Sequence, residues 1–243
     1  MTDTDSLQPA KTEPAGLLNT AVNILTAPGQ AFIELRQRPK KLFPLALVMI
    51  SSMVVMFWYF SIVDFDWFID DSLSTTDLSE EQLEVRREAM LSMSQTTFRM
   101  FGVLGGVIGI LLMSVLQAGY LSLVSALIGD KFKFSHWFSL IAWTGLPYLL
   151  AVIGMAVTIV LSPNGQLSAY DLNPLTLANL GVQSSNASVM TILNALNLTL
   201  VWSLLLVVMA YKQWLQSSLF KALGVVLAPY LLILGVWAYF AFT

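Results

Sequence analysis

The sequence predicts an all-α, polytopic integral membrane protein with five transmembrane helices. Of its 243 residues, 56% are apolar and only 11% are charged, whereas a soluble domain carries about 25% charged residues. The apolar residues also gather in long segments, each at least as long as the roughly 20 residues that span the hydrocarbon core of a bilayer. The five expected spans are about residues 42–63, 98–128, 137–161, 189–210 and 219–242.

The clearest part of this pattern is a helical hairpin between Phe98 and Ser162. Its two apolar segments carry no charge past their first residues, and only Gly129–His136 separates them. A charged side chain in the middle of a bilayer is costly, so uncharged segments of this length are typical of membrane spans.

Two regions are expected before the membrane domain at residues 42–243. Residues 1–16 are polar and are expected to form a disordered tail. Their acidic start differs from a secretory signal, which needs a basic start followed by an apolar run. The first span is therefore expected to act as the insertion signal. Residues 17–41 are expected to form amphipathic helices followed by a basic cluster.

Two amphipathic helices are predicted from an apolar face at helical spacing and from a helix-breaking pair of residues. The break is Pro28-Gly29, and Pro28 suits the first position of a second short helix. We favour helices that lie in the membrane interface, because they lead directly into a span. The alternative is that they pack on the protein's own loops. The apolar face consists of Leu17, Leu18, Ala21, Val22 and Leu25.

The basic cluster before the first span consists of Arg36, Arg38, Lys40 and Lys41. We interpret it as a topology anchor, with binding of anionic lipid head groups as the alternative. In a five-span layout, nine of the twelve lysines and arginines lie on the side of the N-terminus. The positive-inside rule then predicts a cytoplasmic N-terminus and a C-terminus on the outside.

The segment 64–97 is sharply acidic. Ser79 and Gln82 have the spacing of a capping box, which predicts a helix over 79–97 that continues into the second span. The stretch Asp64–Asp71 offers carboxylates to a hard cation, but it lacks the glycine and spacing of an EF-hand loop. We favour a solvated acidic loop and expect no metal.

The second span carries two overlapping pairs of glycines, Gly102/Gly106 and Gly105/Gly109. Small residues at this spacing let another helix approach closely. We favour packing within the molecule, with dimerisation as the alternative.

Two spans carry an internal proline in the same short motif. Pro147-Tyr-Leu-Leu150 in the third span recurs as Pro229-Tyr-Leu-Leu232 in the fifth, 82 residues later. Each proline removes one helical hydrogen bond and is expected to kink its helix. One interpretation is a duplicated helical hairpin, with spans two and three equivalent to spans four and five. Parallel repeats of this kind occur in transporters.

A few polar side chains are expected inside the spans. Gln117 and Tyr120 are expected to bond to neighbouring helices, and Asn194 and Asn197 to share one face of the fourth span. The two asparagines could line a polar path, although such residues more often hold helices together. His136, the single histidine, is expected to have a structural role at the entrance of the third span.

The sequence lacks the residues and motifs that several classes of enzyme and metal site require. The chain has no cysteine, which excludes disulfides, thiolate metal sites and a cysteine nucleophile. It also lacks HExxH, GxSxG and paired membrane aspartates. We therefore expect no enzymatic activity, no catalytic residue and no cofactor, and nucleic acid is not an expected partner.

The layout resembles the Yip family of membrane proteins, named for interaction with Ypt/Rab GTPases, and in particular its bacterial branch. The resemblance covers about residues 17–242 and implies a bacterial inner-membrane protein without enzymatic activity. The chain lacks the Asp-Leu-Tyr-Gly-Pro motif of the eukaryotic branch, so Rab binding is not carried over. The matching segments are Pro28–Phe32, Phe43-Pro44, Gly119-Tyr120, Trp137–Trp143 and Pro147.

Two functions are compatible with these observations. The first is a scaffold or adaptor that binds other membrane proteins, membrane lipids or a second copy of itself. The alternative is a transporter or channel for a neutral small solute. No span carries a charged residue in its interior, whereas ion-coupled carriers usually keep one there.

Overall fold

The computed structural model describes residues 16–74, 76, 78–162 and 164–242. The tail predicted for residues 1–16 lies outside them except for Gly16. Most of the described residues form α-helices, and their only β-type pairing is one isolated bridge between Thr176 and Asn197. The predicted all-α class is therefore confirmed.

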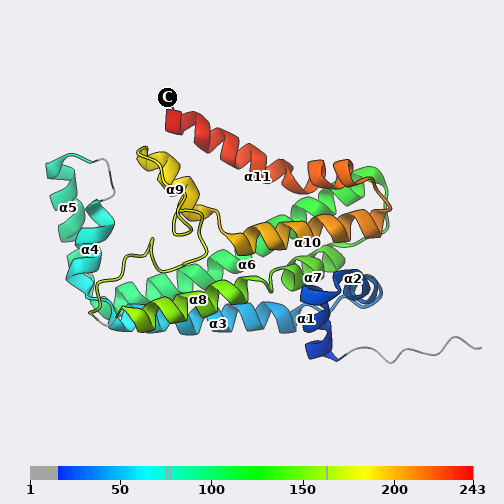
Figure 1. The fold of residues 1–243 in the computed structure, drawn as a ribbon, viewed down its shortest axis with the longest axis horizontal. Coiled ribbons are helices and arrows are strands. Elements are labelled where there is room, and N and C mark those ends of the chain that lie inside the picture. The colour runs from blue at the N-terminus through cyan, green and yellow to red at the C-terminus, as the bar shows by residue number, and fades with distance from the viewer. Residues whose placement is uncertain (1–15, 75, 77, 163, 243) are drawn as a thin grey trace, which may run out of the picture.

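Five helical segments are long and apolar enough to cross a membrane, which confirms a multi-pass membrane protein. Figure 1 shows them running back and forth along the length of the molecule. The segments are α3 (Leu42–Ile62), α6 (Gln95–Ile128), α7 and α8 together (Phe134–Thr144 and Tyr148–Leu161), α10 (Leu198–Leu215) and α11 (Leu219–Phe242).

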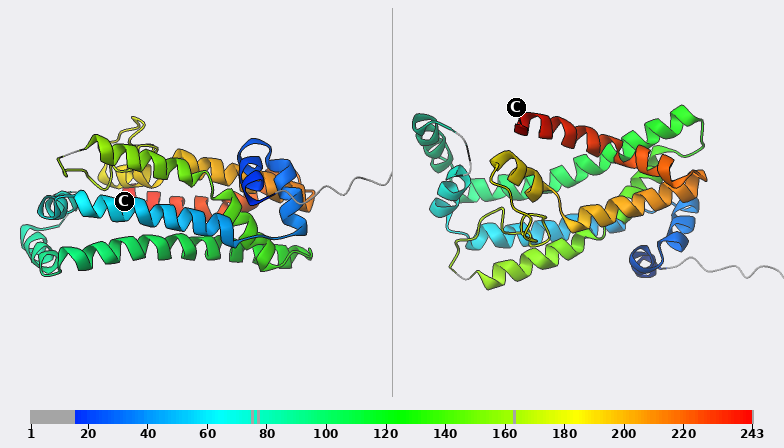
Figure 2. Two further views of the ribbon diagram at one scale, coloured as in Figure 1. Left: turned by 90° about the horizontal axis from the view of Figure 1, so that it is seen from below. Right: turned by 45° about the horizontal axis from the view of Figure 1, so that its top comes forward.

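Shorter helices mark the two ends of this bundle. At the end that we call the N-terminal end, α1 (Leu17–Thr26) and α2 (Pro28–Gln37) lie beside the turns that precede α7 and α11. At the opposite end, α4 (Phe65–Ser74) and α5 (Glu80–Leu91) project beyond the long helices. Figure 2 shows the same arrangement from two further sides.

The core consists of two clusters, one toward each end. The cluster at the N-terminal end is rich in large aromatic side chains, among them Phe32, Trp137, Trp143 and Trp214. The cluster toward the opposite end is built around Tyr59, Phe60, Phe68 and Ile159. Much of the outer surface of the long helices is apolar, as membrane spans require.

The two prolines act differently on their helices. At Pro147 the helix is interrupted rather than kinked, because Gly145–Pro147 form a turn between α7 and α8. α11 continues through Pro229 and bends, as Figure 1 shows between its orange and red parts.

The fourth span differs from its predicted bounds of 189–210. The helix α9 (Ala187–Ala195) is separated from α10 by two extended residues, Leu196 and Asn197. Asn197 caps α10 by accepting a hydrogen bond from the Leu200 amide at 2.9 Å. The loop before α9 pairs with this break through Leu177 N to Leu196 O at 2.8 Å and Leu198 N to Leu175 O at 3.0 Å.

The acidic segment 64–97 differs from its prediction in where its helix ends. The capping box of Ser79 and Gln82 is confirmed by both of its hydrogen bonds. The helix that it begins ends at Leu91 and does not continue into the second span. Ser94 caps a new helix, α6, by accepting from the Thr97 amide at 3.2 Å.

Candidate functional site

The N-terminal helix pair, α1 and α2, is docked against the spans. The apolar side of α2 is fully buried against α7 and α10 through Ala31, Phe32 and Leu35. The Trp214 indole of α10 donates to the Phe32 carbonyl at 2.9 Å, and the Gln213 amide donates to the Gly29 carbonyl at 2.9 Å. α2 therefore packs on the protein's own helices α7 and α10.

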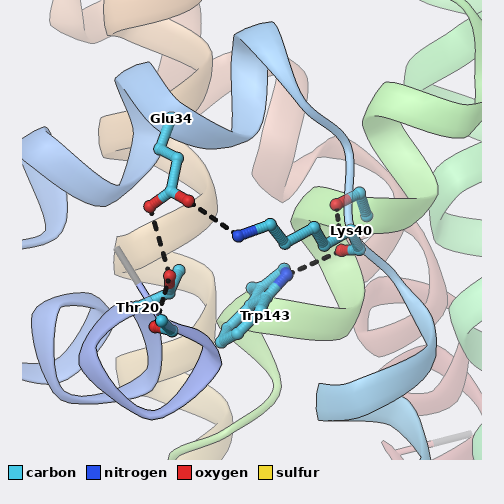
Figure 3. Close-up of polar contacts among 6 residues, drawn as sticks. Thr20, Glu34, Lys40 and Trp143 are labelled. Atoms are coloured by element: carbon cyan, nitrogen blue, oxygen red, sulfur yellow. Dashed lines mark hydrogen bonds and ion pairs between the residues drawn. The ribbon is translucent and has the colours of Figure 1, made fainter. Parts of the chain in front are cut away.

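A polar cluster centred on Lys40 fixes this pair, as Figure 3 shows. The Lys40 ammonium lies 2.9 Å from Glu34 of α2, and Thr20 of α1 donates to the second carboxylate oxygen of Glu34 at 3.2 Å. The Lys40 carbonyl accepts hydrogen bonds from the Trp143 indole at 2.7 Å and from the Ser139 hydroxyl, both in α7. Lys40 thereby joins α2 and α7 at the start of α3, and Glu34 extends the cluster to α1.

The outer side of the helix pair remains accessible. Leu18 and Val22 of α1 are 72% and 58% exposed. Of the predicted basic cluster, Arg36, Arg38 and Lys41 are exposed, while Lys40 is partly buried in its contact with Glu34. An apolar face beside exposed cations is the pattern of a helix at a membrane surface.

The four glycines that the sequence singled out in α6 fall into two kinds. A Cβ atom on Gly102 would lie 2.5 Å from the Phe60 ring of α3, so this glycine is required for packing within the molecule. Gly105, Gly106 and Gly109 have no neighbouring atom within 4 Å of the place where a Cβ would stand. Part of the predicted glycine face therefore lies open on the outer surface of the bundle.

A cavity of about 450 Å³ lies among the long helices. Residues of α3, α6, α7, α8, α9, α10 and α11 line it, together with Leu196 and Asn197 at the break before α10. Asn194 is not among the residues that line it. The prediction that Asn194 and Asn197 share one face of a membrane helix was wrong, because the break places them on either side of a helix end.

The cavity contains polar side chains that the sequence did not single out. Tyr148, Ser203 and Tyr230 line it together with the predicted Gln117. Tyr148 and Tyr230 each follow the proline of the repeated Pro-Tyr-Leu-Leu motif, which is the one signal that could have identified them. Ser203 gave no signal, because single serines are common in membrane helices.

The polar residues of α6 have different surroundings. Tyr120 donates to the Val225 carbonyl of α11 at 2.8 Å, as predicted for a bond to a neighbouring helix. Val225 is four residues before Pro229, so its carbonyl is the one that Pro229 leaves without a helical donor. Gln117, one turn earlier, makes no hydrogen bond to any residue that the structure describes, so the bond predicted for it to a neighbouring helix was wrong.

The turn between α6 and α7 is built by polar caps. Gly129 adopts a left-handed conformation with φ of 75°, and Asp130 Oδ1 accepts from the Phe132 amide at 2.7 Å. His136 accepts from the Lys133 amide at 3.2 Å, which gives the single histidine the structural role that was predicted.

The acidic helices at the opposite end are joined by an ion pair. The Arg87 guanidinium of α5 lies 2.7 Å from Asp70 of α4 and holds the pKa of that carboxyl below its usual value through a hydrogen bond and charge attraction. Within the described residues, no three carboxylate or histidine side chains gather as a metal site would require.

Comparison with known families places most of the chain in one of them. Residues 22–240 match the model of the Yip1 domain. The matched segment includes all five spans, the docked helix α2 and the cavity. Searches of curated proteins and of solved structures returned no match.

Proposed function

The chain belongs to the Yip1 domain family, and from this premise we propose that it is a non-enzymatic membrane scaffold. In this proposal the protein binds other membrane proteins, or a second copy of itself, through the outer face of α6. The N-terminal helix pair contacts lipid head groups at the membrane surface.

The open glycine face of α6 is the observation that carries the proposal. Gly105, Gly106 and Gly109 leave room for another helix, because no atom lies within 4 Å of their Cβ positions. Small residues at this spacing favour association of membrane helices by letting their backbones approach. Gly102, on the same helix, already has a partner in Phe60, which illustrates the close packing that the open positions permit.

The proposed orientation rests on the charges of the two ends. The N-terminal end carries the basic residues of the described chain other than Arg86, Arg87 and Arg99, and the positive-inside rule assigns it to the cytoplasm. A bacterial inner membrane is the proposed location. Because the chain has no cysteine, the variants Ser92→Cys and Lys133→Cys each carry a single thiol. A membrane-impermeable thiol reagent then reports on which side of the membrane that thiol lies. In intact cells, only the cysteine at position 92 should react.

The scaffold proposal is tested with the double variant Gly105→Leu/Gly106→Leu. Native mass spectrometry of the protein, extracted gently with its lipids, should show a stoichiometric partner or second copy that the variant loses. Gly224→Leu is the matched control, since Gly224 of α11 also has no atom within 4 Å of its Cβ position. If complexes of the double variant keep their mass and abundance, α6 does not form the interface.

The cavity favours a second candidate, passage of a neutral small solute. It lies among the spans, and its mostly apolar wall includes several uncharged polar groups that a neutral solute could contact. Flux of glycerol into proteoliposomes, compared between the wild type and Gln117→Leu, tests this candidate. Flux that does not exceed that of protein-free liposomes removes it.

A further inference from the structure

The cavity holds three polar side chains that have no protein partner. Gln117 of α6, Ser203 of α10 and Tyr230 of α11 all line it, and none forms a hydrogen bond to a residue that the structure describes. Other polar side chains of the lining do have hydrogen-bond partners within the protein. The Ser114 hydroxyl donates to the Ile110 carbonyl at 2.7 Å, and the Thr144 hydroxyl donates to the Leu140 carbonyl at 2.9 Å.

Unpartnered polar groups are costly at this position. The three residues lie within segments that cross the membrane, where water is not available to satisfy a hydroxyl or an amide. They come from three different helices and meet at one cavity, so a single bound molecule could satisfy them together. Small-molecule sites have this character, with mostly apolar walls and a few convergent polar groups.

The lining also limits the charge and shape of that molecule. No acidic, basic or histidine side chain of the described residues lines the cavity, so a charged group would enter without a counterion, at high cost. Most of the wall is apolar, with side chains such as Met113, Leu200 and Leu204. A volume of about 450 Å³ lies within the usual range for small-molecule sites.

We propose that this cavity binds an uncharged amphiphile from the bilayer, whose hydroxyl or carbonyl groups pair with Gln117, Ser203 and Tyr230. Its apolar chain lies against the leucine and methionine side chains of the wall. A membrane lipid fits better than a water-soluble solute, because apolar side chains make up most of the lining. None of the three open glycines of α6 lines the cavity, so the site does not depend on the scaffold proposal.

The test uses the full chain in phosphatidylcholine nanodiscs with 1-oleoylglycerol as the probe. A photoreactive 1-acylglycerol, with a diazirine in its acyl chain, should crosslink to peptides that contain Met113 or Leu204. Excess 1-oleoylglycerol should compete with the crosslinking, and glycerol should not. The Gly105→Leu/Gly106→Leu variant should be labelled as strongly as the wild type.

Two variants test the cavity itself. Ser203→Phe fills it and should reduce crosslinking at least about fivefold, since the added ring occupies part of its volume. Ser61→Phe is the matched control, because Ser61 lies exposed on α3. Tyr230→Phe should weaken binding about three- to tenfold, the effect of one neutral hydrogen bond. Tyr170→Phe, in the exposed loop after α8, should leave binding unchanged.

Thermal unfolding separates a lost ligand from a lost fold. The Tyr230 hydroxyl has no partner among the described residues, so Tyr230→Phe should unfold at the wild-type temperature without the probe. It should then gain less stability when 1-oleoylglycerol is added. Crosslinking that persists in Ser203→Phe, or that spreads evenly over the outer faces of the helices, would overturn the proposal. Competition by glycerol would overturn it in favour of a polar solute.

Discussion

The third and fifth spans contain the same four residues, Pro-Tyr-Leu-Leu, and solve the same structural problem in two ways. Pro147 leaves the Trp143 carbonyl without its helical donor, and Pro229 does the same to Val225. In the third span the chain turns, and the Leu146 amide donates to Trp143 at 3.2 Å. In the fifth span the helix continues, and the Tyr120 hydroxyl of α6 donates to Val225 at 2.8 Å.

The surroundings of the two prolines explain the difference. The turn at Pro147 is surrounded by buried residues, and Trp143 is also fixed to the Lys40 carbonyl. α11 has few such contacts. Of an apolar stretch of 18 residues in each span, 11% of the residues are buried in α11 and 33% in the third span. The comparison shows that a proline determines which hydrogen bond is lost, while packing determines whether the helix breaks or bends.

The largest expected difference between the two regions is in stability. Leu146→Ala should lower the free energy of unfolding by about 2–5 kcal/mol, because Leu146 is only 2% exposed and its removal leaves a cavity. Leu232→Ala should change it by less than about 0.5 kcal/mol, since Leu232 is 68% exposed on the outer surface of α11. Denaturant titration in mixed micelles measures both, and equal losses would contradict the comparison.

A smaller effect is expected where Tyr120 substitutes for the missing helical bond. Tyr120→Phe should cost about 1 kcal/mol, since the Val225 carbonyl loses its donor in an apolar environment. In the Pro229→Ala background the same substitution should cost less, because an alanine at position 229 can donate to Val225 from its own backbone. A double-mutant cycle measures this coupling. Additive losses would mean that Tyr120 does not replace the helical bond.

The turn at Pro147 should respond differently to the loss of its proline. Pro147→Ala should destabilise the protein by about 0.4–1 kcal/mol, mainly because the unfolded chain gains freedom. The turn itself should persist, because the buried contacts of Trp143 and Leu146 remain. Hydrogen exchange of the residues around 145–147 checks this expectation. Amide protection as strong as that of a continuous helix would show that the proline alone causes the break.

The smallest effect is expected outside the spans, where water competes for the polar groups. The pKa of Asp70 is lowered in the folded state by Arg87, so the pair contributes stability above the ordinary carboxyl pKa. This contribution is lost as the pH falls through the lowered folded value, and it is small because both side chains are exposed. Hydrogen exchange of α4 and α5 should show this acid sensitivity in the wild type and not in Arg87→Gln.

The number of spans and the class of fold follow from local patterns in the sequence. Long uncharged apolar segments predict membrane helices because each segment must satisfy its own backbone in a bilayer. The capping box at Ser79 and the positions of both prolines were also visible, since each depends on residues a few positions apart. The match of residues 22–240 to the Yip1 domain agrees with the resemblance inferred from the segments around Pro28 and Trp137.

The way in which these elements meet could not be predicted from local patterns. The break before α10 depends on loop residues around Leu175 and Leu177. The docking of α2 depends on Trp214 and Gln213, which lie 182 and 184 residues from their partners in the chain. The cavity likewise combines residues from seven helices. Local patterns determine the free energy of forming each helix, whereas these features depend on contacts between residues far apart in the sequence.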